Sequence, residues 1–334
     1  MKRTTNDLLP ILDKSSKEFS GAWKKARTKA SEKAIHDLRV STRRLIATLE
    51  LVQALSKSDQ TSKLRRRLKK VLKSMSSLRD LQVQLENSSQ IPPLGLIATF
   101  RRGLERRERR EIDRLHDELK RGRRQRLTAA VEDVRSKFGR LNESLGRVRI
   151  RRSVEHVLSL RRNEFLRAER RFQRLQPLDE GALHEMRIAL KKLRYVVEAA
   201  QPVLGPSAKQ QARVMHAFQQ LMGDSRDVEM LRAELEEWAK KKGRTIAVVP
   251  ALEELKEKRE GLLKKIIESS DELEQILMGE TPKPVAETTY ASLDALPTRP
   301  FRPEVDNFPG GKDFVSEPVM RRTKSNGHSG VRDI

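Results

Sequence analysis

The chain has 334 residues and carries 71 Lys and Arg against 47 Asp and Glu, a formal net charge of +24. It contains no cysteine, which excludes a disulfide framework and any site built on a thiolate, and no apolar run approaches the roughly 18 residues of a membrane span. The N-terminal sequence MKRTTNDLLPILDK lacks the apolar segment of a secretory signal. These features predict a soluble cytoplasmic protein with an anionic partner.

Residues 1–278 have the pattern of helices almost throughout, because apolar residues recur every three or four positions. Good helix formers dominate, and no alternating run is long enough to predict a sheet. The predicted fold class is all-α, and the segments 92–121 and 250–278 have the length of helices in bundles. Breaks between helices are expected at 56–61, 87–95, 122, 146, 176–181, 202–207, 222–224 and 243–250.

The composition changes at about residue 279. The segment 279–334 holds seven of the 14 prolines and carries eight basic and eight acidic residues, so the whole net charge belongs to 1–278. A Pro-rich segment with few apolar residues buries too little surface to offset the entropy of ordering. We predict a disordered tail; its role as a docking peptide for a partner protein stays open.

The strongest feature of the sequence is an internal repeat at an offset of 148 residues. The segment AIHDLRVSTRRLIATLELV at 34–52 aligns with ALHEMRIALKKLRYVVEAA at 182–200, so that each copy has a histidine followed by basic residues at the same spacing. A repeat this long favours duplication, with one half at 5–146 and the other at 147–278, related by a pseudo-twofold axis.

A second match, at an offset of 147, follows the first. It places Arg79–Asp80 on Arg226–Asp227. We expect these pairs to fix helix junctions, with the aspartate acting either as an N-cap or as a partner of an arginine.

The repeated histidine lies on a basic helix face. At about 100° per residue, His36, Arg39 and Arg43 share one side of a helix and Leu38 and Leu45 share the other. An anion among these cations would relieve their repulsion and raise the pKa of the imidazole. The candidate anion-binding residues are His36, Arg39, Arg43 and Arg44 in the first copy, His184, Arg187, Lys191, Lys192 and Arg194 in the second, Arg66, Lys69 and Lys73 in a basic stripe of the first half, and Arg213 and His216 at matching positions of the second half.

These segments resemble the CHAD family, the conserved-histidine α-helical domain. Its pattern is a His-x-x-Arg-Val-x-x-Arg-Arg-Leu-Arg helix, then a helix ending in Gly-x-x-Arg-Asp, all of it repeated. HDLRVSTRRLI and HEMRIALKKLRYVVE follow the first element, and Gly223 stands in the second, where the first half has Ser76. The resemblance, over about residues 5–278, implies two antiparallel four-helix bundles, a basic cavity or pore between them that binds inorganic polyphosphate, and association with polyphosphate granules.

Two other functions stay open. The basic runs RRGLERRERR at 101–110 and KRGRRQR at 120–126 could grip the backbone of RNA or DNA, although intervening acids reduce their field. His36 or His184 could accept a phosphoryl group in a phosphotransfer or phosphohydrolase protein. No cluster of carboxylates for Mg²⁺ and no Gly-rich phosphate loop accompanies them, so we expect no enzyme activity, no metal and no cofactor.

Overall fold

A computed structural model gives the fold of the chain and describes residues 8–89, 91, 95–120, 123–175 and 179–278. These residues form helices joined by short turns, with no strand among them, and the predicted all-α class is confirmed. The predicted disordered tail and the break expected at 122 lie outside the described residues. The α-helices are α1 (Leu8–Thr28), α2 (Glu32–Ser56), α3 (Asp59–Ser74), α4 (Ser76–Ser88), α5 (Gly95–Lys120), α6 (Arg123–Glu143), α7 (Arg147–Leu175), α8 (Glu180–Leu204), α9 (Ser207–Lys241) and α10 (Val249–Met278), with a short 3-10 helix, η1 (Ile246–Val248), before the last.

One predicted break is wrong. The helix α9 runs without interruption through 222–224, where a break was expected. Gly223 lies inside this helix, and the neighbouring side chains of Met222 and Ser225 are buried. Packing of these neighbours therefore outweighs the low helix propensity of glycine. The matching point of the first half does break, at Met75, which separates α3 from α4.

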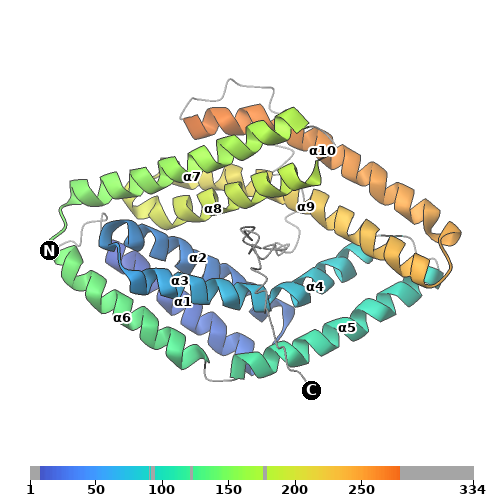
Figure 1. Cartoon of the computed structure of the whole chain (residues 1–334), viewed down its shortest axis with the longest axis horizontal. Coiled ribbons are helices and arrows are strands. Elements are labelled where there is room, and N and C mark those ends of the chain that lie inside the picture. The colour runs from blue at the N-terminus through green and yellow to red at the C-terminus, as the bar shows by residue number, and fades with distance from the viewer. Residues whose placement is uncertain (1–7, 90, 92–94, 121–122, 176–178, 279–334) are drawn as a thin grey trace, which may run out of the picture.

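The helices form two groups, which meet where α2 of one packs against α8 of the other. Figure 1 shows α7 to α10 along the top and α1, α2, α3 and α6 below, while α4 with α5 and α9 with α10 extend to the same side as two long arms. The helix α2 packs against α1, α3, α7 and α8, so it is enclosed on several sides. A motif helix in this position places its side chains at the junction of the two groups.

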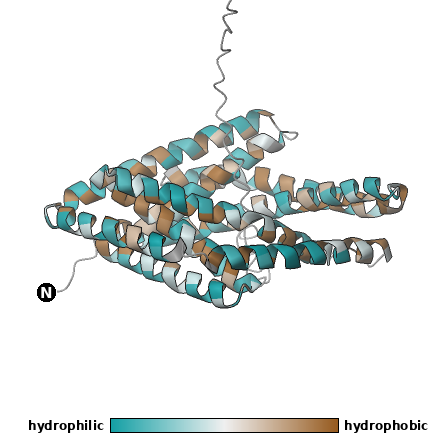
Figure 2. Cartoon of the chain, turned by 60° about the horizontal axis from the view of Figure 1, so that its bottom comes forward, coloured by the Kyte–Doolittle hydropathy of each residue, from teal (hydrophilic) through white to brown (hydrophobic). Residues whose placement is uncertain are grey.

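Three hydrophobic clusters make up the core. The first is built on α1, α2, α3 and α6 but also includes Ile150 of α7 and Val196 of α8, and the second lies among α7, α8, α9 and α10. The third joins the two arms, where the ring centres of Phe100 of α5 and Trp238 of α9 lie 5.6 Å apart. Figure 2 shows hydrophobic and hydrophilic residues alternating along each helix, as expected for helices that bury one face. Because two clusters take residues from both sides of residue 147, the two predicted halves share their core.

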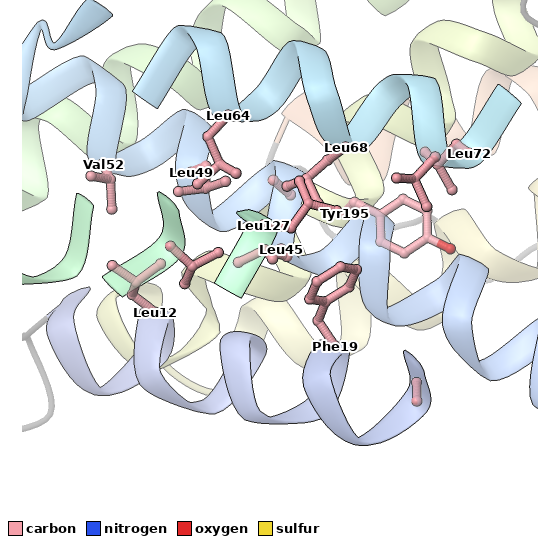
Figure 3. Close-up of a cluster of buried hydrophobic side chains, with 14 of the residues drawn as sticks. Leu12, Phe19, Leu45, Leu49, Val52, Leu64, Leu68, Leu72, Leu127 and Tyr195 are labelled. Carbon is pink, nitrogen blue, oxygen red and sulfur yellow. The ribbon is translucent and has the colours of Figure 1, made fainter. Parts of the chain in front are cut away.

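The inner face of α3 is apolar. Figure 3 shows Leu64, Leu68 and Leu72 on the side of α3 that faces α2. They meet Leu45 and Leu49 of α2 in the first hydrophobic cluster, where all five side chains are buried. The Lys and Arg side chains of α3 therefore point away from this core.

We expect Leu68→Ala to lower the free energy of unfolding by about 3 kcal/mol, because it leaves a cavity in a fully buried contact. Denaturant unfolding followed by circular dichroism measures this loss. Leu160→Ala is the matched control, since Leu160 is 55% exposed and its truncation should change stability by less than about 0.5 kcal/mol. Equal losses in the two variants would contradict the assigned core.

Candidate functional site

The two motif helices are capped in the same way. The side chain of Ser31 accepts a hydrogen bond from the backbone N–H of Ala34 at 3.3 Å before α2, and that of Asp179 accepts one from Ala182 at 3.0 Å before α8. Each cap satisfies an N–H that the first helical turn leaves free. The caps stand 148 residues apart, so the motif residues of both helices begin in the same register.

Buried cations concentrate on and beside these two helices. Among the described residues, six Lys and Arg side chains are buried, whereas the buried carboxylates are Asp227 and Glu169. Burial of a cation is costly unless an anion or hydrogen-bond acceptors replace its water. We call the six side chains the buried cationic cluster: Arg39, Arg79 and Arg187, each 1% exposed, with Arg43, Lys191 and Arg194, each 6% exposed.

The carboxylate of Asp80 on α4 lies among arginines from both groups of helices. Burial raises the pKa of Asp80 to about 6, against the opposing charges of Arg39, Arg226, Arg79 and Arg187. Arg39 comes from α2 and Arg187 from α8, so both motif helices act on one carboxylate. Arg39 and Arg187, which occupy matching positions of the repeat, therefore lie near the same carboxylate.

The repeated Arg–Asp pairs connect α4 with α9. The charge of Asp227 acts on Arg79, and the charge of Arg226 acts on Asp80, so each arginine interacts with the aspartate of the other segment. Of the two roles predicted for the aspartates, the structure shows that of a partner to an arginine. The alternative that the aspartate is an N-cap is wrong, because Met75 occupies the N-cap of α4 and α9 passes through Asp227 without a break.

The predicted residue His216 contacts the buried cationic cluster through Arg194. Its Nη1 donates a hydrogen bond to Glu198 at 2.9 Å and lies 3.1 Å from Nδ1 of His216. The guanidinium carbon also lies 4.5 Å from the ring centre of Tyr195, a cation–π distance. Tyr195 was missed by the sequence analysis because the matching position of the first copy is Ala47, so the repeat carries no signal there.

The two motif histidines have different surroundings. His36 is 7% exposed and lines a groove of about 1100 Å³ beside α1, α2 and α4, whereas His184 is half-buried. Arg39 and Arg43 lie outside the lining of this groove. The charged residues of the lining are Lys17, Lys25, Lys33 and Arg44 together with Glu18, Glu32, Asp37, Glu86 and Glu108, so its charges nearly balance.

Arg44 and Lys192, which occupy matching positions of the repeat, are held in ion pairs. Arg44 lies 3.6 Å from Glu18 and 4.0 Å from Glu198, and the Nζ of Lys192 lies 2.5 Å from Glu164. Glu18 and Glu164 are themselves at similar places before the two motifs. The charges of these two cations are therefore compensated at least in part by carboxylates.

A network of ion pairs links α2, α3 and α7. Glu50 accepts hydrogen bonds from Arg65 and Arg161, both at 2.6 Å. Lys69 lies beside this network, where burial first and then the charges of Arg65 and Lys192 lower its pKa. The structure thus brings the predicted residues Lys69 and Lys192 near one another, although they come from different halves. Arg65 and Arg161 were missed because neither stands out from the basic runs that contain it.

The remaining candidates face outward. Arg66 and Lys73 on α3 and Arg213 on α9 are exposed, so they do not belong to the buried cationic cluster.

The described residues contain no group of three His, Asp or Glu side chains placed to hold a metal ion. None of the described helices has both the length and the apolar character needed to cross a membrane.

Comparison with known proteins agrees with the histidine motifs. The CHAD domain family matches residues 11–236. This chain belongs to the CHAD family. A crystal structure of the CHAD domain from the plant Ricinus communis is similar to this CHAD domain, with a TM-score of 0.60 and 18% identity over 84% of this chain and 93% of the plant chain. No curated protein matches the sequence.

We expect Glu50→Gln to destabilise this CHAD domain by about 2 kcal/mol, because it leaves Arg65 and Arg161 close together with no carboxylate between them. Thermal and denaturant unfolding measure the loss. Glu155→Gln is the control: it removes an exposed pair with Arg151, which contributes less than about 1 kcal/mol. A loss no greater than that of the control would show that the Glu50 network does not hold the helices together.

Proposed function

We propose that this CHAD domain binds inorganic polyphosphate through the buried cationic cluster. The observation that carries the proposal is the excess of buried positive charge, six Lys and Arg side chains against two carboxylates among the described residues. Phosphoryl oxygens accept charge-assisted hydrogen bonds, and a guanidinium group can donate two of them in parallel. A phosphate chain would supply the anionic acceptors that offset this burial.

The side chains of the buried cationic cluster offer hydrogen-bond donors for phosphates, as a phosphate polymer without bases requires. Arg39 and Arg187 converge on Asp80, so one ligand at this position would reach donors from both motif helices. Arg43 and Lys191 follow one helical turn later and would bind the next phosphoryl groups. The ligand would need no stacking platform. Every aromatic side chain among the described residues is buried or half-buried, whereas stacking contributes about 1–3 kcal/mol per base when proteins bind single strands.

The groove beside His36 gives this site an approach from solvent. His36 stands three residues before Arg39 on α2, so the lining of the groove and the buried cationic cluster are adjacent on one helix. The balanced charge of the groove gives it little attraction of its own. We therefore assign the tight contacts to the cluster and only the approach to the groove. Retention at polyphosphate granules in cells follows from such binding.

Nucleic acid is the alternative ligand, and the pairing of α5 argues against it. Arg107 of the run 101–110 is bound to Glu234, and Arg114, further along α5, donates to Glu111 and to Glu118, so part of the positive charge of α5 is compensated by carboxylates. Competition at equal phosphate concentration separates the ligands. Long-chain polyphosphate should displace labelled RNA efficiently, and RNA should displace labelled polyphosphate poorly. The reverse order would favour the nucleic-acid role.

We propose binding without catalysis. His36 and His184 lie among cations, and no metal-binding group of carboxylates accompanies them in the described part of the chain. Incubation with long-chain polyphosphate should therefore release no orthophosphate.

The double variant Arg39→Gln and Arg187→Gln should weaken polyphosphate binding about 100-fold, since each lost charge-assisted donor costs about 1.5–3 kcal/mol. Isothermal titration at fixed ionic strength measures the change. Lys240→Gln with Lys241→Gln removes the same charge at exposed sites and should change the affinity less than about twofold. Arg39→Lys with Arg187→Lys keeps the charge and should lose less than the Gln pair. Equal losses in the Gln pair and the exposed pair would mean diffuse attraction instead of a site.

Binding should tighten as pH falls. A histidine gains its positive charge as pH drops through about 6.5, and a bound polyanion favours the imidazolium form. The carboxyl of Asp80 acts in the same direction, because its pKa is raised to about 6 and it loses its negative charge as pH falls through that value. Both changes make the site more positive in acid.

Titrations between about pH 8 and pH 5.5 test this response. His36→Gln with His184→Gln should remove the upper part of the change. Asp80→Asn, which is neutral at every pH, should bind more tightly at high pH and show a smaller rise towards low pH. An affinity that stays flat in the wild-type protein would exclude the histidines and Asp80 from the binding mechanism.

A further inference from the structure

The outer face of α3 is strongly cationic, and the buried cationic cluster does not account for it. The helix has the sequence DQTSKLRRRLKKVLKS, with seven Lys and Arg and a single acidic residue. Its apolar side chains are buried against α2 and α6. We call five exposed side chains the α3 stripe: Lys63, Arg66, Arg67, Lys70 and Lys73.

The spacing of the α3 stripe aligns its charges along one side of the helix. Successive residues of the stripe are three positions apart, except that Arg66 and Arg67 are adjacent. Residues three or four positions apart are neighbours on a helix surface, so these side chains form a continuous row. From Lys63 to Lys73 the row extends about 15 Å. Like charges at this spacing repel one another and destabilise a helix. The row is therefore unfavourable for the helix by itself and would be relieved by a bound polyanion.

Some exposed arginines outside α3 have carboxylate partners. Arg151 lies 2.8 Å from Glu155, and Arg135 lies 2.5 Å from Asp13. Within the part of the chain that the structure describes, no salt bridge involves a residue of the α3 stripe. Its field therefore reaches solvent with little compensation.

The stripe is confined to the first half of the chain. At the matching positions, the second half has one cation, and the helix α9 forms there without the others. The fold of this helix pair therefore does not require the charges of the stripe. The residues at these positions of α9 are Gln210, Arg213, Val214, Ala217 and Gln220.

Lys69 connects the stripe to the motif helix of the second half. On α3 it stands three residues after Arg66 and four before Lys73, so it borders the stripe. The charge of Lys192 on α8 acts on it, and Lys192 follows Lys191 of the buried cationic cluster in the sequence. Cations of α3 and α8 thus come close together beside the cluster, at Lys69 and Lys192.

We propose that the α3 stripe binds the part of a polyphosphate chain that continues beyond the buried cationic cluster, so that the protein favours long chains and holds them over one side only. This inference rests on the proposed function. A single flexible chain of phosphates can follow one helix without any base contacts. Since the described residues offer no exposed aromatic side chain for stacking, polyphosphate fits this surface better than single-stranded nucleic acid.

The triple variant Lys63→Gln, Arg67→Gln and Lys70→Gln separates the stripe from the cluster. It should leave the affinity for tripolyphosphate unchanged, because that ligand is short enough to occupy the cluster alone. It should weaken the binding of long-chain polyphosphate roughly tenfold, because three contacts at the surface are lost. The salt dependence of long-chain binding should also become shallower, because fewer counterions are released.

A matched control removes three exposed lysines that have acidic partners: Lys240→Gln, Lys241→Gln and Lys264→Gln. It has the same net charge as the α3 variant and should change the affinity for either ligand less than about twofold. An equal loss in both triple variants, or an equal loss of tripolyphosphate and long-chain binding in the α3 variant, would overturn the inference. So would a loss confined to single-stranded RNA, which would assign the stripe to nucleic acid.

Failure of the proposed function would look different. If the wild-type protein does not bind tripolyphosphate, or if Arg39→Gln with Arg187→Gln binds it as well as the wild type, the buried cationic cluster is not the site. If the affinity for tripolyphosphate depends on the cluster while the α3 variant binds long-chain polyphosphate as tightly as the wild type, the cluster is the binding site. The proposed role of the α3 stripe is then refuted.

Discussion

The structure depends on the burial of guanidinium and ammonium groups where α2 meets α8. Arg39 and Arg187 are each 1% exposed, and both act on Asp80. A guanidinium group stays charged at neutral pH, and on burial it loses the water that solvates it in the unfolded chain. The internal carboxylates offset part of this cost, and a bound polyanion would offset more. Stability and ligand binding are therefore linked through the same few side chains.

A continuous apolar framework holds these cations in place. The first hydrophobic cluster reaches from α1 to α8, and the third joins the two long arms, so two of the three clusters tie the halves of the chain together. Around the cluster, ion pairs such as Glu50 with Arg65 and Arg161 fix helices from both halves. This arrangement orders the cationic side chains before a ligand arrives, which reduces the entropy that binding must overcome.

The two halves are similar in their motif helices and different in their surfaces. The capping residues Ser31 and Asp179 match, as do the ion pairs of Arg44 and Lys192. The α3 stripe has no equivalent on α9. The proposed polymer would therefore extend over the side of the molecule that carries the stripe. This additional surface is the basis of the length dependence inferred for long chains.

Sequence alone determined the helical class, most helix boundaries, and the helix face that carries His36 and Arg39, because helical periodicity reports directly on which residues share a side. It could not determine what covers that face. Arg39 and Arg44 are both basic and close in sequence, yet one is enclosed and the other is exposed in ion pairs. The continuous helix through Gly223 and the pairing of Asp80 with arginines of another helix also depended on tertiary contacts. Burial and charge compensation arise between segments far apart in the chain, so only the packed structure decided which cations are enclosed and which are held in exposed ion pairs.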